Sequence, residues 1–83
     1  MAFRVELSEL AAGRLRKLDG NLQNRIIRKL AQTARDPSRF LERLSALESY
    51  KLRVGDYRLF IDADWKGNTL YVLTLGHRRV VYR

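Results

Sequence analysis

The chain has 83 residues with no cysteine and one histidine, and its formal net charge is +8. This length allows one small core, so residues 1–83 are expected to form a single domain. The absence of cysteine excludes disulfides and thiolate metal sites, and a lone histidine argues against a histidine-based metal cluster, so no metal or cofactor is expected.

The basic residues are mostly arginines, thirteen of seventeen. The planar fork of arginine suits phosphate better than the point charge of lysine, which favours nucleic acid or another acidic partner. No apolar run approaches the ~20 residues of a membrane span, and the start of the chain lacks the apolar core of a signal peptide. A cytoplasmic protein that does not contact membranes is therefore expected.

The first half of the chain predicts one strand and a helical hairpin. Phe3 to Leu7 alternates apolar and charged residues, as a half-buried strand does. A helix is expected from about Glu9 to Leu18, and a second helix from Leu22 to Ala34, stopped by Asp36-Pro37. Their outward basic residues are expected to form only a solvated surface: Arg14, Arg16, Lys17, Arg25, Arg28, Lys29 and Arg35.

The segment Tyr50 to Ile61 predicts a β-hairpin with a two-residue turn at Gly55-Asp56. That turn would set Leu52 opposite Leu59, with apolar residues on one face. The other face would carry Lys51, Arg53, Arg58 and Phe60. Arg53 would lie directly across from Arg58, and opposed like charges cost stability, so the pair favours a bound anion.

The flanking segments are assigned from pattern alone. Phe40 to Leu47 predicts one helical turn or a packed loop, and Trp65, at the tip of a longer turn, is expected to fold back over the sheet edge. Thr69 to Leu75 predicts a central strand buried on both faces and ended by Gly76. His77 to Arg79 would form a bend, and Val80 to Tyr82 a short strand or tail.

The order of elements predicts an α+β fold. A two-helix hairpin would pack on one face of a three- to four-stranded antiparallel sheet, with an N-terminal strand added. The opposite sheet face, which bears the basic residues of the hairpin, would remain open to solvent or to a ligand.

Two runs of the chain resemble the RelE/ParE superfamily of toxins from type II toxin–antitoxin systems. They are Lys51-Leu52-Arg53 with Tyr57-Arg58 after three residues, and Gly76-His77-Arg78-Arg79-Val80-Val81-Tyr82. The resemblance covers nearly the whole chain and implies a RelE-like fold. It also implies an endoribonuclease, a ribosome-dependent mRNA interferase that cleaves mRNA in the ribosomal A site and so inhibits translation.

By motif position, the resemblance implies that Lys51, Arg58, Arg78 and Tyr82 are catalytic. Ser49 stands where some members of the superfamily carry a second lysine. The residue types fit cleavage without a metal, in which the 2′-hydroxyl attacks the adjacent phosphorus and the site stabilises phosphoryl charge. Lys51, crowded by arginines, would act as base or electrostatic stabiliser, Arg58 would clamp the phosphate, Arg78 would stabilise charge, and Tyr82 would stack on a base.

Four further residues are expected to bind RNA around this site: Arg53, Phe60, His77 and Arg79. The implied partners are an acidic RelB-like antitoxin, the ribosome and mRNA. Two alternatives stay open, a ParE-like toxin that binds and inhibits DNA gyrase and a basic RNA-binding domain without catalysis. Presence of the four catalytic candidates together favours the endoribonuclease.

Overall fold

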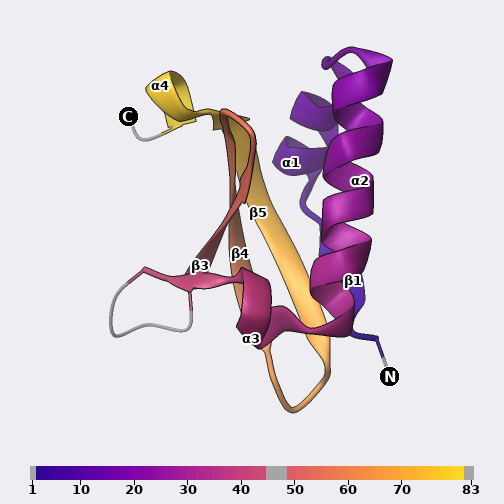
Figure 1. The fold of residues 1–83 in the computed structure, drawn as a ribbon, viewed down its shortest axis with the longest axis vertical. Coiled ribbons are helices and arrows are strands. Elements are labelled where there is room, and N and C mark those ends of the chain that lie inside the picture. The colour runs from indigo at the N-terminus through magenta and orange to yellow at the C-terminus, as the bar shows by residue number, and fades with distance from the viewer. Residues whose placement is uncertain (1, 45–48, 82–83) are drawn as a thin grey trace.

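The structure is a computed structural model that describes residues 2–44 and 49–81. Its sheet has the strand order β1-β5-β4-β3-β2, in which β1 runs parallel to β5 and the other pairs are antiparallel. Helices α1 and α2 lie on one side of the sheet, and α4 lies on the other side (Figure 1). The elements are β1 (Arg4–Leu7), α1 (Glu9–Arg16), α2 (Gly20–Arg35), α3 (Pro37–Phe40), β2 (Glu42–Arg43), β3 (Ser49–Val54), β4 (Tyr57–Asp64), β5 (Thr69–His77) and α4 (Arg78–Val81).

This arrangement confirms the predicted α+β fold with a helical hairpin on one sheet face. Both long helices have side-chain N-caps. Ser8 Oγ accepts from the backbone N–H of Ala11 at 3.0 Å, and Asp19 Oδ1 accepts from that of Leu22 at 3.0 Å. Such caps satisfy N–H groups that have no partner in the first helical turn.

The predicted end of the first helix was two residues too late, because α1 ends at Arg16. The backbone N–H groups of Lys17 and Leu18 bond carbonyls three residues back, which tightens the chain before α2. Gln23 Nε2 then donates to the Leu18 carbonyl at 2.7 Å. The amide thereby satisfies a carbonyl at the helix end, and α2 can begin at Gly20.

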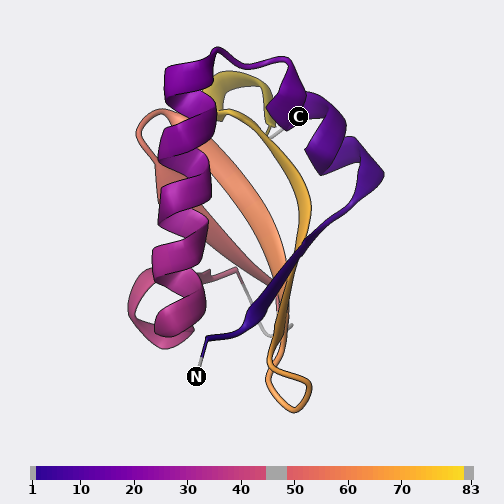
Figure 2. The same cartoon turned by 90° about the vertical axis from the view of Figure 1, so that its right-hand side faces the viewer.

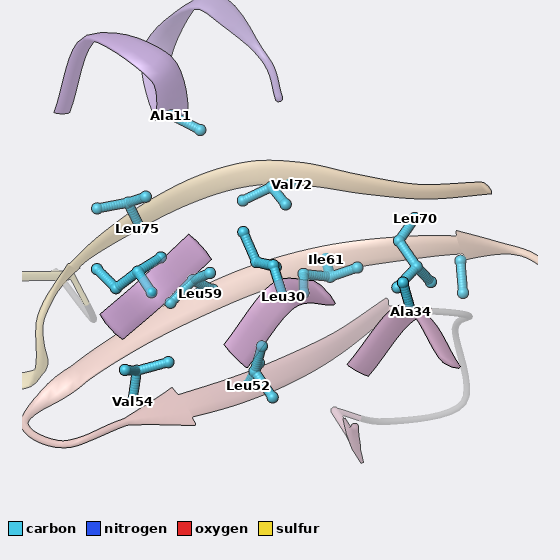
Figure 3. Close-up of a cluster of buried hydrophobic side chains, with 12 residues drawn as sticks. Ala11, Leu30, Ala34, Leu52, Val54, Leu59, Ile61, Leu70, Val72 and Leu75 are labelled. Atoms are coloured by element: carbon cyan, nitrogen blue, oxygen red, sulfur yellow. The ribbon is translucent and has the colours of Figure 1, made fainter. Parts of the chain in front are cut away.

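The predicted register of the β3–β4 hairpin is confirmed. Leu52 pairs with Leu59, Arg53 with Arg58, and Gly55 in the turn has φ 60°. One face of the hairpin packs under α2, where Leu52 and Leu59 are buried with Ile26 and other apolar side chains of α2, β4 and β5 (Figure 3). Each fully buried leucine or isoleucine contributes about 1.5–3 kcal/mol to stability.

Strand β5 is central, as predicted, but it is not buried on both faces and it continues to His77. Tyr71 and Leu73 are 40% and 42% exposed. An apolar run indicates burial on both faces only when layers cover both, and here the long helices cover one. The β4–β5 register also shifts between Phe60 and Ile61.

Of the two alternatives predicted for Val80 to Tyr82, the short strand is wrong for the described residues, because Arg78–Val81 forms the helical turn α4. The imidazole of His77 offers a local cause, since its Nδ1 accepts from the backbone N–H of Arg79 at 3.2 Å. This bond draws the chain out of the extended conformation. Tyr82 lies outside the described residues.

The remaining predictions concern a loop and a helix surface. Trp65 folds back as expected and contacts Phe3 and Tyr50 edge-on, with ring centroids 5.6 and 5.9 Å apart. The stretch from Phe40 to Leu47 holds the end of α3 and then β2, and its residues 45–47 lie outside the described part. Arg14 is more than a solvated residue, because its Nη1 donates to Thr74 Oγ1 at 2.8 Å.

Candidate functional site

Four of the predicted site residues lie together on the sheet face away from α2. Lys51 pairs with Phe60 across β3 and β4, and Arg53 pairs with Arg58 two residues further along. Directly opposed residues share a sheet face, so these four side chains project to the same side. We call them the cationic face.

Arg58 is the most enclosed member of the cationic face. It lies on β4 between Arg53 of β3 and Gly76 of β5, and it is only 7% exposed. The open face expected from the sequence is thus closed around this arginine, whereas the Arg53 side chain is 59% exposed.

The Nε atom of Arg58 is buried and has no hydrogen-bond partner within the described residues. A buried charged donor without a partner costs stability, by about 1–3 kcal/mol for an ordinary polar group and more for a charged one. Strained or unsatisfied groups in native proteins are commonly placed where a ligand binds. The natural ligand of a guanidinium is an oxyanion, which accepts two parallel hydrogen bonds.

Glu42 is a member of the site that the sequence did not reveal. It pairs with Lys51 across β2 and β3, and its carboxylate lies 3.6 Å from Lys51 Nζ and 4.0 Å from Arg53 Nε. The two-residue strand that brings Glu42 there falls in a stretch whose spacing indicated a helical turn. The carboxylate of Glu42 therefore offsets part of the positive charge that Lys51 and Arg53 bring to the site.

The second predicted cluster lies at the end of β5 and in α4. Arg78 donates its backbone N–H to the Asp56 carbonyl at 2.8 Å, which ties α4 to the β3–β4 turn. The side chains of Arg78 and Arg79 are exposed, and His77 is half-buried. The structure therefore brings α4 to the hairpin end of the cationic face, while the predicted role of Tyr82 falls on a residue outside the described part.

The donor chemistry of the site is cationic. Within residues 2–44 and 49–81 no group of three or more His, Cys, Asp or Glu side chains is placed to hold a metal ion. The helices of the same part are too short or too polar to cross a membrane. What the cationic face can do is bind an oxyanion and stabilise negative charge that develops on it.

The fold and the cationic face together define a class, the small basic toxins of the RelE/ParE superfamily. Within it, the chain belongs to the family described as the ParE toxin of type II toxin–antitoxin systems, whose model matches residues 5–82. It is therefore a toxin of a type II toxin–antitoxin system. No functionally curated protein matches the chain.

Three solved structures show the same fold. A chain of the RelBE2 toxin–antitoxin complex of Mycobacterium tuberculosis has a TM-score of 0.81 and 23% identity over 94% of this chain and 93% of its own. A doubly substituted Escherichia coli toxin RelE in the free state has a TM-score of 0.79 and 23% identity over 99% of this chain and 90% of its own. A chain of the archaeal RelE–RelB complex of Pyrococcus horikoshii has a TM-score of 0.78 and 25% identity over 98% of this chain and 100% of its own.

Proposed function

We propose that this toxin is an endoribonuclease that cleaves mRNA in the ribosomal A site, an mRNA interferase. The observation that carries the proposal is Arg58, buried beside Lys51 and Arg53 with its Nε unpartnered within the described residues. Such a guanidinium is held ready for a phosphate, and pre-formed charge stabilisation contributes a large share of the catalysis of phosphoryl transfer. The RelE-like fold supports the proposal as an analogy of architecture.

The proposed reaction needs no metal. The 2′-hydroxyl loses its proton to water and attacks the adjacent phosphorus, the bond to the 5′-oxygen breaks, and that oxygen takes up a proton from water. The products are a 2′,3′-cyclic phosphate and a 5′-hydroxyl. Arg58 donates hydrogen bonds to the non-bridging oxygens, and Arg78 stabilises charge on the leaving oxygen. Lys51, whose Nζ lies 3.6 Å from the Glu42 carboxylate, is proposed to add positive charge that stabilises the phosphoryl group.

Residues around the proposed catalytic residues would bind the RNA. Phe60 pairs with Lys51 and offers a half-buried ring, and Tyr82 is proposed to stack on an unpaired base. His77 and Arg79, at the junction of β5 and α4, would contact the neighbouring phosphates. The proposed partners are the ribosome, mRNA and an acidic RelB-like antitoxin that covers the cationic face.

A second candidate function is inhibition of DNA gyrase by binding. It is favoured by the matching family model, which describes a ParE toxin. This function requires a docking surface and no cleavage chemistry, so it gives no reason for a buried Arg58 whose Nε has no partner among the described residues.

Primer extension on mRNA, with and without programmed ribosomes, separates the two candidates when it is run beside a gyrase supercoiling assay. New 5′ ends that appear only with programmed ribosomes support the proposal. Inhibited supercoiling with intact mRNA overturns it in favour of the second function. RNA binding with neither effect overturns both and leaves a basic RNA-binding toxin.

A further inference from the structure

A second cationic site lies between α2 and the β3–β4 hairpin. It is a hollow of about 650 Å³ lined by Arg25, Arg28, Lys29 and Arg35 of α2 and by Arg53 of β3. No acidic side chain is among the described residues that line it. We call it the α2–β3 groove; Figure 2 shows the β3–β4 turn beside α2.

The spacing of α2 builds this groove. Residues three and four apart lie on one helix face, so Arg25, Arg28 and Lys29 gather there while Ile26 and Leu30 turn into the core. Like charges at this spacing destabilise a helix by a few tenths of a kcal/mol per pair. Within the described residues, Arg25, Arg28 and Arg35 form no ion pair that offsets this repulsion. A bound anion would offset the repulsion between these side chains.

Gly55 shapes the end of the groove. A Cβ atom at this position would lie 3.1 Å from Nη1 of Arg25 and 3.4 Å from its Cζ. A side chain at residue 55 would therefore push the guanidinium of Arg25 away from the turn by a few tenths of an ångström. The same residue has φ 60°, which glycine adopts at no steric cost.

Arg53 joins the groove to the cationic face. It lines the groove, and it also pairs with Arg58 across β3 and β4. Strand β2 pairs with β3 only at Tyr50 and Lys51, so no described strand covers the β3 edge at Arg53. Positive charge thus continues from α2 around this edge to the candidate catalytic residues.

We propose that the α2–β3 groove binds backbone phosphates of the RNA strand whose neighbouring segment reaches Lys51 and Arg58. This inference rests on the proposed function. It separates two tasks, since the groove holds the strand at a distance from the scissile phosphate and the cationic face performs the reaction. One continuous polyanion is the ligand that contacts both places.

An acidic protein segment fits the groove less well. Protein partners anchor through large apolar or aromatic side chains in pockets. The apolar lining here is limited to Ala31 and Val54, both small, and Val54 is itself buried at 4% exposure. Phosphates need no such anchor, because arginine forks bind them directly.

The test is the double variant Arg28→Ala/Arg35→Ala, with Arg16→Ala/Lys17→Ala as the matched control outside the groove. The probe is a single-stranded RNA with 2′-deoxy residues at every cleavable position, titrated by fluorescence anisotropy across a range of salt. Loss of two phosphate contacts lowers the slope of log K against log salt by about 1.4, at ~0.7 per contact. The control pair should leave the slope within about 0.3 of the parent value, and Arg28→Lys/Arg35→Lys should restore it.

Three results overturn the inference. The first is an unchanged slope in the groove variant, and the second is an equal loss of slope in the control pair. The third comes from a parallel titration with poly-glutamate: if the groove variant loses binding to poly-glutamate and keeps its binding to RNA, the groove belongs to an acidic protein. Thermal melts confirm folding. Because the probe cannot be cut, binding is scored separately from cleavage.

The proposed function and the groove can fail independently. If the parent protein cuts no mRNA but the groove variant shows the slope change, only the proposed function is refuted. If the parent cuts mRNA but the groove variant shows no slope change, only the groove is refuted.

Discussion

Arg58 combines two demands that oppose each other at a single residue. It is 7% exposed, and its Nε has no hydrogen-bond partner in the part of the chain that the structure describes. These features lower the stability of the free toxin, and the same features suit the side chain to an incoming phosphate. Active sites commonly hold groups that would be replaced if stability alone mattered. Stability and activity should therefore change in opposite directions when the charge is removed.

We expect Arg58→Met to raise the free energy of unfolding by about 1 kcal/mol, because an unbranched apolar side chain fills the site without a buried charge. Cleavage of ribosome-bound mRNA should fall by about a hundredfold or more, as loss of one transition-state charge stabiliser costs ~3 kcal/mol. Urea denaturation and single-turnover cleavage measure the two effects. Arg16→Met, at an exposed position of α1, is the control and should change neither. Arg58→Met that unfolds more easily yet cuts normally contradicts both assignments.

Removal of the negative charge of Glu42 should strengthen RNA binding, whereas removal of the positive charge of Arg58 should weaken cleavage. Glu42→Gln keeps the shape of the side chain but removes the negative charge beside Lys51 and Arg53. RNA affinity should rise up to about fivefold, the scale of one half-exposed ion pair, with the unfolding free energy changed by less than about 1 kcal/mol. Anisotropy with uncleavable RNA checks this. Glu6→Gln, whose partner Arg4 lies on the distant strand β1, is the control, and weaker binding by Glu42→Gln would show that Glu42 itself assists the ligand.

At the scale of elements, the β3–β4 turn depends on a glycine. Gly55→Val should lower the free energy of unfolding by about 2 kcal/mol or more, since a β-branched residue resists φ 60°. The new Cβ would also displace the Arg25 guanidinium, 3.1 Å away. Gly20→Ala is the control. A Cβ there meets nothing within 4 Å, so the change should stabilise α2 by about 0.5–1 kcal/mol. Equal melting temperatures for the two variants would contradict the role of the turn.

The elements that the sequence predicted well are those specified by local chemistry. Ser8 as a cap and Gly55 as a turn residue act on their immediate neighbours, so α1 and the register of β3 and β4 follow from them. The two-residue strand β2 depends instead on pairing with Lys51 and Tyr50, which no local pattern encodes. Glu42 was missed for this reason, and the α2–β3 groove because it requires α2 and β3 to be placed together.

The same distinction applies to the cationic face. Alternation in the hairpin placed Lys51, Arg53, Arg58 and Phe60 on one face, as the structure does. The burial of Arg58 could not be predicted, because it depends on what covers this face of β4 in the folded chain, which the hairpin alone does not encode. Residue types and a hairpin can identify a face, while the depth of each side chain depends on its tertiary neighbours.

At the scale of the whole molecule, the net charge of +8 should dominate association with RNA. We expect the apparent affinity for ribosomes to fall by at least about tenfold between low and physiological salt, because binding releases condensed counterions. Sedimentation of the toxin with ribosomes across a salt series measures this. Competitor RNA controls for nonspecific contacts, and an affinity independent of salt would show that apolar contacts carry the binding.

The parallel pairing of β1 with β5 constrains the order of events during synthesis. Arg4 pairs with Thr69, so the first strand of the sheet finds its only described strand partner 65 residues later. Long-range pairing of this kind is slow and must await the distant partner. We expect residues 1–68 to show no cooperative thermal unfolding by circular dichroism, and a cooperative transition in that fragment would disprove the dependence on β5. Under the proposed function, a nascent toxin would then stay inactive toward the ribosome that makes it until β5 has emerged. That delay would give a newly made antitoxin time to bind it.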